Sequence, residues 1–327
     1  MTPGEPTLRV DGLRTYFFTR AGILKAVDGV SFSVSAGEVI GLVGESGSGK
    51  SVTGFSILGL IDPPGRVVGG RLLFQGEDLV QADEERLRTL RGRRIAMVFQ
   101  DPMMTLNPVL RIDTQMVETL QAHVPMARAK ALERCRDALA RVGIPAPEAR
   151  LTCYPHELSG GMRQRVAIAI AMLHRPALII ADEPTTALDV TIQGQILAQM
   201  QQLCREQHTA LIWITHNLAV VAGMADRICV MYAGRIVEQG ATDDVLDRPL
   251  HPYTRGLIRS LPANNPRGGR LFQIPGMVPQ PLNLPAGCAF AQRCPRADAA
   301  CAADPGATEP EAGREVRCHH PHLDGAP

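Results

Sequence analysis

The chain has 327 residues, enough for one large or two medium-sized domains, with 45% hydrophobic and 20% charged residues, as in an ordinary folded protein. A formal net charge of +1 gives no electrostatic reason to expect a nucleic-acid partner. The first residues, MTPGEPTLRV, lack the basic start and apolar run of a signal peptide. No apolar run approaches the roughly 18 residues that a membrane helix needs, so we expect any membrane role to come through partner subunits. The eight cysteines suggest a reducing cytoplasm, where thiols bind metal more often than they form disulfides.

Two strands are predicted at the amino-terminal end, over residues 8–18 and 26–34, joined by a turn at 20–22. The run Tyr16-Phe17-Phe18 stands out because aromatic residues make up only 4% of the chain. One interpretation is edge-strand packing. The other is that a ring stacks on a nucleobase, since base–aromatic stacking tolerates any base.

Residues 37–60 predict a buried strand, a glycine-rich turn and a helix, and Gly44-x4-Gly49-Lys50-Ser51 matches the phosphate-binding loop GxxxxGK[ST]. Glycines let backbone N–H groups converge on an anion, and the helix points its positive end at the same place. Lys50 can reach the β- and γ-phosphates, and the Ser51 hydroxyl can ligate Mg²⁺. We therefore predict that a nucleoside triphosphate binds to Gly44, Ser46, Gly47, Ser48, Gly49, Lys50, Ser51 and Val52.

The middle of the chain predicts a charged surface helix at DEERLRTLRG and then an apolar strand over residues 94–100. This strand ends in Gln100, and ligands of parallel α/β sheets bind at carboxyl ends of strands, so Gln100 is a candidate contact for Mg²⁺ or the attacking water. Between 111 and 142 the pattern becomes helical, with Cys135 and Leu139 on one apolar face. We interpret this region as a helical insertion in an α/β core.

Three further polar groups follow predicted structural boundaries. Ser159-Gly160-Gly161 precedes a long helix, which makes a second anion site or an ordinary N-cap. The apolar strand in 177–184 ends in Asp182, a candidate Mg²⁺ ligand, and Glu183, a candidate to orient or deprotonate water. Another apolar strand, ALIWIT, ends at His216, a candidate contact for the γ-phosphate.

Taken together, GESGSGKS, Gln100, LSGGMRQR, ADEP, ALD at 187–189 and His216 resemble the ATP-binding cassette (ABC) family in identity, order and spacing. The resemblance covers about three quarters of the chain, and LSGG separates this family from other phosphate-loop ATPases. It implies an α/β fold: an ABC-type phosphate-loop ATPase core with a helical subdomain. We expect the ATPase domain at 1–247, with the helical subdomain at about 101–176.

The resemblance also implies a role for each motif. Two cassettes pair head to tail, and ATP with Mg²⁺ lies between the Lys50 loop of one chain and Ser159, Gly160, Gly161 and Gln164 of its partner. Tyr16 stacks on adenine, Gln100 senses Mg²⁺ and the transporter, Glu183 is the general base, Asp189 couples the two sites and His216 holds the γ-phosphate. No motif position is degenerate, so the chain is expected to hydrolyse ATP.

The tail, including HPYTRGL at 251–257, resembles the carboxyl-terminal extension of oligopeptide and dipeptide importer ATPases, and we assign it to 248–327. DPMMTLNP is similar to the same subfamily, although Met104 and Thr105 depart from its usual DPMTSLNP. The expected partners are a second ATPase subunit, two transmembrane permeases and an extracytoplasmic substrate-binding protein, with this translocase subunit peripheral at the cytoplasmic face of the plasma membrane. Import of nickel or another solute is an alternative. A soluble ABC protein of DNA repair or translation is not favoured, because a second cassette and a long coiled coil are missing from the sequence.

Four of the eight cysteines, Cys288, Cys294, Cys301 and Cys318, fall within 31 residues rich in Pro, Gly and Ala. Such a segment buries little apolar surface, so a metal could hold it together. Four thiolates suit zinc or an iron–sulfur cluster, and the spacing does not choose between them. The family resemblance favours a 4Fe–4S cluster, and His319 and His320 keep zinc as an alternative. Cys153, Cys204 and Cys229 receive no function.

Overall fold

The computed structural model describes residues 5–186, 188–266 and 268–322, which form two sheets and the helices around them. The strands are β1 (Leu8–Thr19), β2 (Gly22–Val34), β3 (Val39–Val43), β4 (Gly65–Phe74), β5 (Glu77–Asp78), β6 (Ile95–Val98), β7 (Leu178–Asp182), β8 (Ala210–Thr215), β9 (Arg227–Tyr232), β10 (Arg235–Ala241), β11 (Thr308–Glu311) and β12 (Arg314–Val316).

The α-helices are α1 (Lys50–Leu58), α2 (Glu84–Leu90), α3 (Ile112–Gln121), α4 (Arg128–Arg141), α5 (Pro147–Leu151), α6 (Gly160–Met172), α7 (Val190–Gln207), α8 (Leu218–Ala222), α9 (Thr242–Asp247) and α10 (Pro252–Arg259). Short 3₁₀ helices are η1 (Pro102–Met104), η2 (Pro155–Glu157), η3 (Pro262–Asn264), η4 (Ala291–Arg293) and η5 (Ala299–Ala302). Within the described residues, no helix is both long and apolar enough to cross a membrane.

The large sheet carries the predicted apolar strands side by side. Its order is β11-β12-β10-β9-β3-β8-β7-β6, and β9, β3, β8, β7 and β6 run parallel. Every residue of β3, β7 and β8 is buried, which explains their continuous apolar runs. Because parallel strands end at the same edge, the residues that follow β3, β6, β7 and β8 are brought together there.

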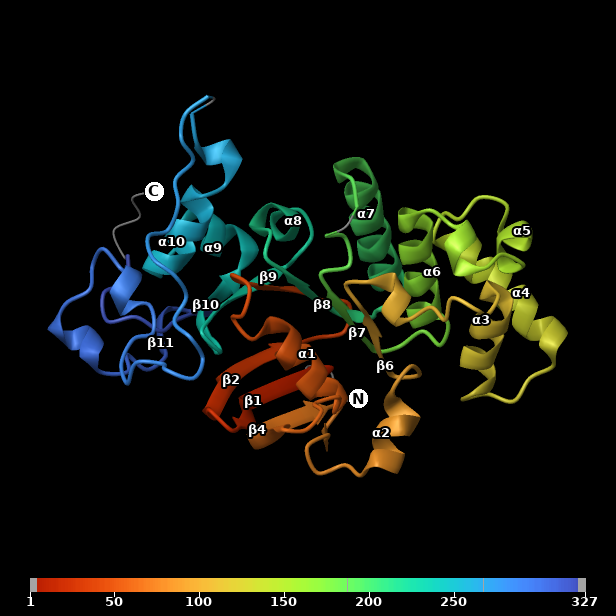
Figure 1. Ribbon diagram of the computed structural model, residues 1–327, viewed down its shortest axis with the longest axis horizontal. Helices are drawn as coiled ribbons and strands as arrows, with labels where there is room; N and C mark the ends of the chain where they lie inside the picture. Colours follow the sequence, from red (N-terminus) through yellow and green to blue (C-terminus); the bar gives the residue numbers. More distant parts are fainter. Residues whose placement is uncertain (1–4, 187, 267, 323–327) are drawn as a thin grey trace.

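The large sheet separates two apolar cores. Along β3, Val39 and Val43 pack into one core, whereas Ile40 and Leu42 pack into the other, as the two-residue period of a strand requires. Helix α1 lies in the second core, between the large sheet and the smaller antiparallel sheet, and contacts β1, β2, β7 and β8 (Figure 1). The phosphate loop that precedes α1 is thus held between two sheets.

The smaller sheet has the order β2-β1-β4-β5. The sequence predicts its first two strands, but β2 begins at Gly22 rather than at 26, so β1 and β2 form a long hairpin that pairs Thr19 with Gly22. Ala26 of this hairpin lies against Gly49, the residue that precedes α1.

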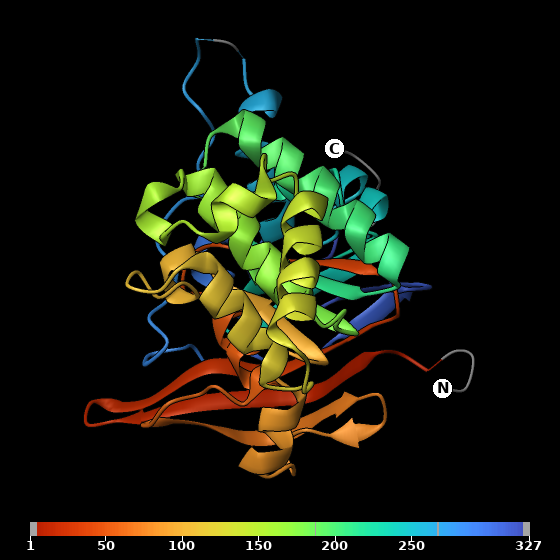
Figure 2. The same ribbon diagram turned by 90° about the vertical axis from the view of Figure 1, so that its right-hand side faces the viewer.

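The predicted helical insertion divides into α3, α4 and α5, which gather with α6 and α7 on the other face of the large sheet (Figure 2). Pro125 stands between α3 and α4, where a proline cannot continue a helix. Cys135 and Leu139 are fully buried in the first core, as the helical period predicts, whereas Leu132 is only partly buried. Burial also raises the pKa of the Cys135 thiol to about 12, consistent with a purely apolar role.

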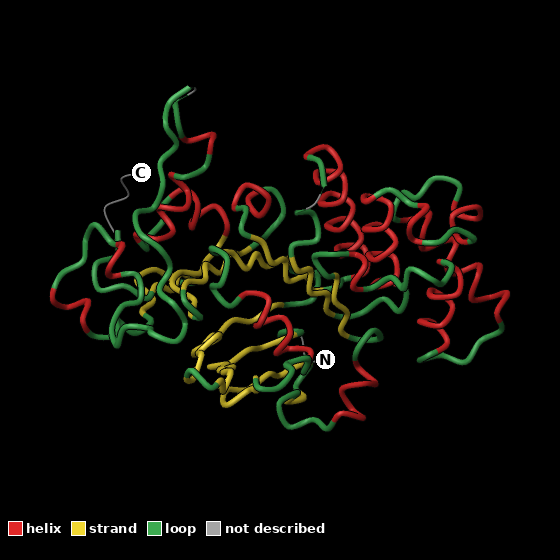
Figure 3. The backbone as a smooth tube through the Cα atoms, viewed as in Figure 1, coloured by secondary structure: helices red, strands yellow, loops and turns green. Residues whose placement is uncertain are grey.

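The carboxyl-terminal segment is mostly loop, yet it continues the large sheet (Figure 3). Strand β12 pairs with β10, and β11 pairs with β12. The Arg314 guanidinium on β12 lies 3.1 Å from the Glu238 carboxylate on β10, and both side chains are almost completely buried. The boundary proposed between 247 and 248 therefore separates two segments that share one sheet.

Candidate active site

A cavity of about 1300 Å³ lies at the carboxyl edge of the large sheet. Nine described residues of the predicted phosphate and catalytic site line it, namely Ser46, Gly47, Gly49, Lys50, Ser51, Val52, Gln100, Glu183 and His216. Motifs spread over more than 170 residues of sequence thus meet in one place, because each follows a strand of the same parallel sheet.

The phosphate loop requires glycine at two of its positions. Gly44 has a φ of 156° and Gly49 a φ of 101°. A Cβ atom would collide with the carbonyl oxygen of Met231 at Gly44 and with that of Ala26 at Gly49. Close packing of backbone against backbone therefore fixes the loop in the form that presents its N–H groups to an anion.

Lys50 is the first residue of α1, and its ammonium group reaches back to the start of the phosphate loop. Its Nζ donates hydrogen bonds to the carbonyl oxygens of Gly44 and Glu45, at 2.8 and 3.0 Å. Burial lowers the pKa of Lys50, an effect opposed by the negative charges of Glu183, Asp182 and Glu45. A mostly buried cation at a loop rich in N–H groups matches the demands of a triphosphate.

Ser51 and Asp182 form the predicted magnesium-binding pair. The Ser51 hydroxyl donates to Oδ1 of Asp182 at 3.0 Å, and Asp182 ends strand β7. Burial raises the pKa of Asp182, and the hydrogen bond from Ser51 opposes that shift. A hydroxyl and a carboxylate in contact, beside the phosphate loop, are the oxygen donors that Mg²⁺ prefers.

Glu183 and His216 meet because β7 and β8 are adjacent. His216 Nδ1 lies 3.0 Å from Glu183 Oε1, and the Thr186 hydroxyl donates to Glu183 Oε2 at 3.0 Å. Glu183 itself has a φ of 44°, a strained value for a residue that is not glycine. The two contacts hold the carboxylate at the cavity wall, where a general base is needed.

The serine–glycine motif lies at the predicted helix start but away from the cavity. Ser159 caps α6, and its hydroxyl accepts a hydrogen bond from the N–H of Met162 at 3.3 Å. Ser159 and Gly160 are exposed, and none of the described residues that line the cavity comes from this motif, Gly161 included. Gln164 is buried at 1% exposure, so its predicted contact with nucleotide is not supported by its position.

Asp189 caps helix α7, since its carboxylate accepts from the N–H of Ile192 at 2.9 Å. It is exposed near the start of α6, where Leu188 lies against Gly160. Ala187, the first residue of the ALD motif, lies outside the described residues. Asp189 is thus placed beside the serine–glycine motif rather than in the cavity.

The aromatic residue of β1 that lines the cavity is one position away from the predicted one. Tyr16 is not among the described residues that line the cavity, whereas Phe17 is. The Tyr16 hydroxyl donates to Asp28 at 2.6 Å, and burial together with that bond raises the pKa of Tyr16 to about 12. Successive side chains of a strand point to opposite faces, so only one of the two rings can face the cavity. We therefore replace Tyr16 by Phe17 in the candidate site.

One wall of the cavity is not predicted from the sequence. The described residues of that wall come from the carboxyl-terminal segment, and they are Leu257, Ser260, Leu271, Phe272, Gln273, Ile274, Gly276, Pro281 and Arg293. Thr19, Leu24, Ala26, Glu45, Pro64 and Thr186 complete the lining. Apart from Leu257, which ends the motif HPYTRGL, the residues of that wall belong to no motif, and they line the cavity because of the way the tail packs.

The four tail cysteines are free thiols that lie in one neighbourhood, since the charges of Cys288, Cys294 and Cys301 each affect the pKa of Cys318. Burial raises the pKa of Cys318 to about 11. Backbone N–H groups two residues further on point at three of the sulfurs: Phe290 at Cys288, Arg296 at Cys294 and His320 at Cys318. Such N–H···S contacts orient sulfur for a thiolate-bound metal.

Among the described residues, the donor atoms that lie close enough to share a metal ion are not those of the four cysteines. Donor atoms of Asp298, Cys301 and His320 lie within 4.8 Å of one another. The four cysteines do not form a group of that tightness, so the sulfurs are not gathered as a single tetrahedral zinc ion requires, with sulfurs roughly 4 Å apart. His319 instead contacts the carbonyl of Ala303.

Comparison with known proteins decides the family. A model described as ABC transporter matches residues 27–186, and one described as oligopeptide/dipeptide transporter, C-terminal region, matches 237–301. The dipeptide transport ATP-binding protein DppD of Escherichia coli K12 is 48% identical over 320 residues, which is 98% of each chain. The chain belongs to the ATP-binding proteins of ABC peptide transporters.

Other relatives and solved structures agree with this ABC assignment. The oligopeptide transport ATP-binding protein OppD of Salmonella typhimurium is 47% identical over 98% of this chain and 95% of its own. A dimeric ATP-binding cassette, solved in a post-hydrolysis state with ADP and Pi, matches with a TM-score of 0.65 at 25% identity, over 72% of this chain and 98% of that one. The ABC fold predicted from the motifs is confirmed, as is the peptide-transporter type of ABC protein.

Proposed function

We propose that this chain is the ATP-hydrolysing subunit of an ABC importer for dipeptides or oligopeptides. The observation that carries the proposal is the similarity to peptide-transport ATP-binding proteins along 98% of the chain, tail included. The cavity adds the chemistry, because it gathers a phosphate loop, a hydroxyl–carboxylate pair and a carboxylate–histidine pair. Nickel or another solute as the cargo is not favoured by these relatives.

In the proposed reaction, Lys50 and the loop N–H groups hold the β- and γ-phosphates. Glu183 accepts a proton from water as that water attacks the γ-phosphorus, the bond to the β–γ bridging oxygen breaks, and ADP and phosphate result. His216 contacts the γ-phosphate and holds the Glu183 carboxylate, and Gln100 would contact the same water and Mg²⁺. Ser51 and Asp182 would hold Mg²⁺, which neutralises charge that develops on the phosphate oxygens.

Two copies of such a cassette would complete the site. Ser159, Gly160 and Gly161 are an exposed helix start outside their own chain's cavity, which suits them to cap a nucleotide held by a second subunit. Asp189, which caps the neighbouring helix, is placed to couple that contact to the start of α7. Closure on ATP and reopening after hydrolysis would then drive the membrane partners.

The base of the nucleotide is proposed to stack on Phe17. We expect Phe17→Ala to weaken ATP binding by about 1–3 kcal/mol, because base–aromatic stacking is lost. Tyr16→Ala is the matched control: its ring stands one position along the same strand, off the cavity, and we expect a smaller loss. Dissociation constants from titration calorimetry test the pair, and equal losses for both variants would contradict the assignment of Phe17.

The membrane partners are proposed to be two permeases, served by an extracytoplasmic substrate-binding protein, with this subunit peripheral at the cytoplasmic face. A candidate docking surface follows β6, where Met104 and Val109 are 72% and 75% exposed beside the helical region. Exposed large apolar side chains of this kind are unusual unless a partner covers them. Their position next to Gln100 would let permease movements reach the ATP site.

The tail cysteines are proposed to hold a 4Fe–4S cluster. The three N–H···S contacts and the shared neighbourhood of the four thiols support a thiolate site, and a four-iron cluster is wider than one zinc ion. Such a cluster would cross-link a segment that is otherwise mostly loop. Zinc held by Cys301 and His320 with Asp298 is the competing arrangement.

Copurification tests the function most simply. The full chain, tagged and isolated from its own cells in mild detergent, is expected to bring down polytopic membrane subunits and a second ABC ATPase. Recovery with nucleic acid and no membrane subunit would contradict the importer assignment and support the soluble alternative.

A further inference from the structure

Arg293 links the cysteine-rich tail directly to the phosphate loop. It lies in η4, immediately before Cys294, and its guanidinium donates two hydrogen bonds to the Glu45 carboxylate at 2.6 and 3.1 Å. The Arg293 side chain is only 4% exposed. Two groups that are 248 residues apart in sequence thus form a two-pronged ion pair, with the Glu45 side chain 31% exposed, beside the ATP cavity that both of them line.

The position of Arg293 is fixed by contacts other than Glu45. Its Nε donates to the carbonyl oxygen of Pro275 at 2.9 Å, and its Nη1 lies 3.3 Å from the Tyr232 hydroxyl. The guanidinium also lies over the rings of Tyr232 and Phe290. Arg293 is therefore a held cation that sets where Glu45 can be, rather than a mobile side chain that follows it.

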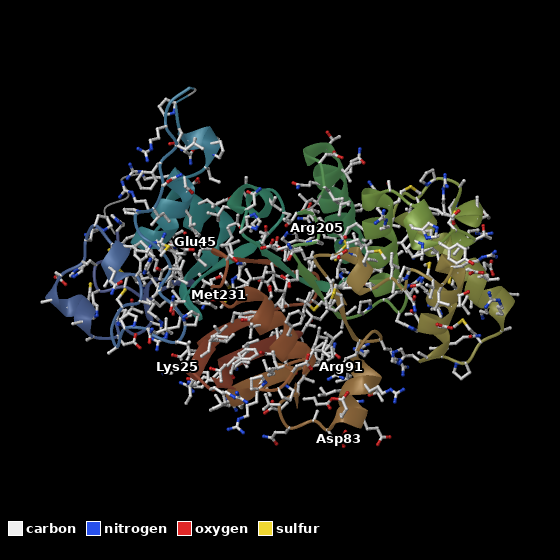
Figure 4. All side chains as sticks on the ribbon, in the orientation of Figure 1. Lys25, Glu45, Asp83, Arg91, Arg205 and Met231 are labelled. Carbon is white, nitrogen blue, oxygen red and sulfur yellow. The ribbon has the colours of Figure 1, made fainter. Side chains whose placement is uncertain are left out.

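The backbone N–H, the carbonyl oxygen and the carboxylate of Glu45 all form hydrogen bonds. Its N–H donates to the Tyr253 hydroxyl on α10 at 2.9 Å, and its carbonyl oxygen accepts from Lys50. Glu45 is the first variable residue of the phosphate loop, and Figure 4 places it on the side of the molecule where α9 and α10 lie. Arg293 and Tyr253 thus tie the phosphate loop to the carboxyl-terminal segment at one residue.

The charge of Glu45 creates a conflict that Arg293 resolves. A carboxylate in the loop that binds a triphosphate adds negative charge beside several others, and that repulsion is strong where water is partly excluded. An arginine paired through both carboxylate oxygens cancels that charge and leaves the loop N–H groups free to bind phosphate.

We infer that Arg293 is a positioning residue for ATP: it neutralises Glu45 and fixes the phosphate loop, so that the carboxyl-terminal extension is part of the nucleotide site. The inference rests on the proposed function, since it assumes that the cavity binds ATP. By reciprocity, bound ATP stabilises the extension that carries Arg293.

The test is a double-mutant cycle on the full chain, with a non-hydrolysable ATP analogue and Mg²⁺ as the probe. We expect Arg293→Met to weaken binding by roughly five- to 150-fold, the usual range for coupled sites. Adding Glu45→Gln to Arg293→Met should restore most of that loss, because the uncompensated charge is gone. Arg293→Lys keeps the charge without the two-pronged geometry and should fall between wild type and Arg293→Met.

Arg270→Met, at an exposed arginine of the same extension, is the control for loss of positive charge and should bind as wild type does. Unchanged affinity in Arg293→Met overturns the inference. So does a double variant that binds as weakly as Arg293→Met, because a purely structural arginine would not be rescued by removing a carboxylate. Failure of the wild-type chain to bind the analogue would instead contradict the proposed function itself.

Discussion

Glu183→Gln is expected to lower ATP turnover by roughly 10²- to 10⁴-fold, the contribution of a positioned general base. Glutamine keeps the size and the contact with Thr186 but cannot accept the proton from the attacking water. ATP binding should persist, because the phosphate loop and Lys50 are untouched. Phosphate release gives the turnover, and retention of radiolabelled ATP after gel filtration gives the binding.

Glu85→Gln is a matched control, since it makes the same chemical change at an exposed position on α2, far from the phosphate loop in sequence. It should hydrolyse ATP at the wild-type rate. Undiminished hydrolysis by Glu183→Gln would contradict the assignment of the base. If ATP binding is lost together with turnover, Glu183 contributes to the binding of ATP rather than to the chemical step alone.

Replacing the tail cysteines should remove a metal centre. For protein purified without oxygen, we expect iron and acid-labile sulfide in equal amounts, near four of each per chain, as a 4Fe–4S cluster requires. Cys294→Ser or Cys318→Ser should abolish most of this iron and destabilise the extension, because few apolar contacts hold its loops together. Elemental analysis, visible absorbance and limited proteolysis of the tail measure the three effects.

Cys153→Ser is the control for this experiment, because Cys153 is a partly buried free thiol on a loop outside the tail. It should leave iron, sulfide and proteolysis unchanged. Zinc at full occupancy without iron would refute the cluster and support Cys301 and His320 as ligands. Metal-free protein with an ordered, protease-resistant tail would refute both metals.

Local sequence patterns predict the core of this fold because its signals are local. The apolar runs of β3, β7 and β8 are continuous since both faces of the sheet are covered, and polar residues at their ends converge because parallel strands share an edge. The same logic places Glu183 beside His216 from strands that neighbour one another only in the fold.

The features that the sequence does not predict depend on long-range packing. Strand alternation says that Tyr16 and Phe17 face opposite sides, but only the packing of the hairpin on α1 decides which side is the cavity. The pairing of Arg293 with Glu45 has no local signal at all, because neither residue belongs to a motif that requires the other. The wall that the tail adds to the cavity was invisible for the same reason.

We propose that ATP bound in this cavity powers the import of peptides. The most direct measurement is the release of a labelled oligopeptide loaded inside proteoliposomes that contain the copurified complex, with the ATPase subunits outside and the substrate-binding protein inside. We expect export of peptide from the lumen to the ATPase side that requires ATP and stops with Glu183→Gln. ATP hydrolysis at the full rate by isolated monomers, with no ATP-dependent peptide movement in the complex, would contradict it.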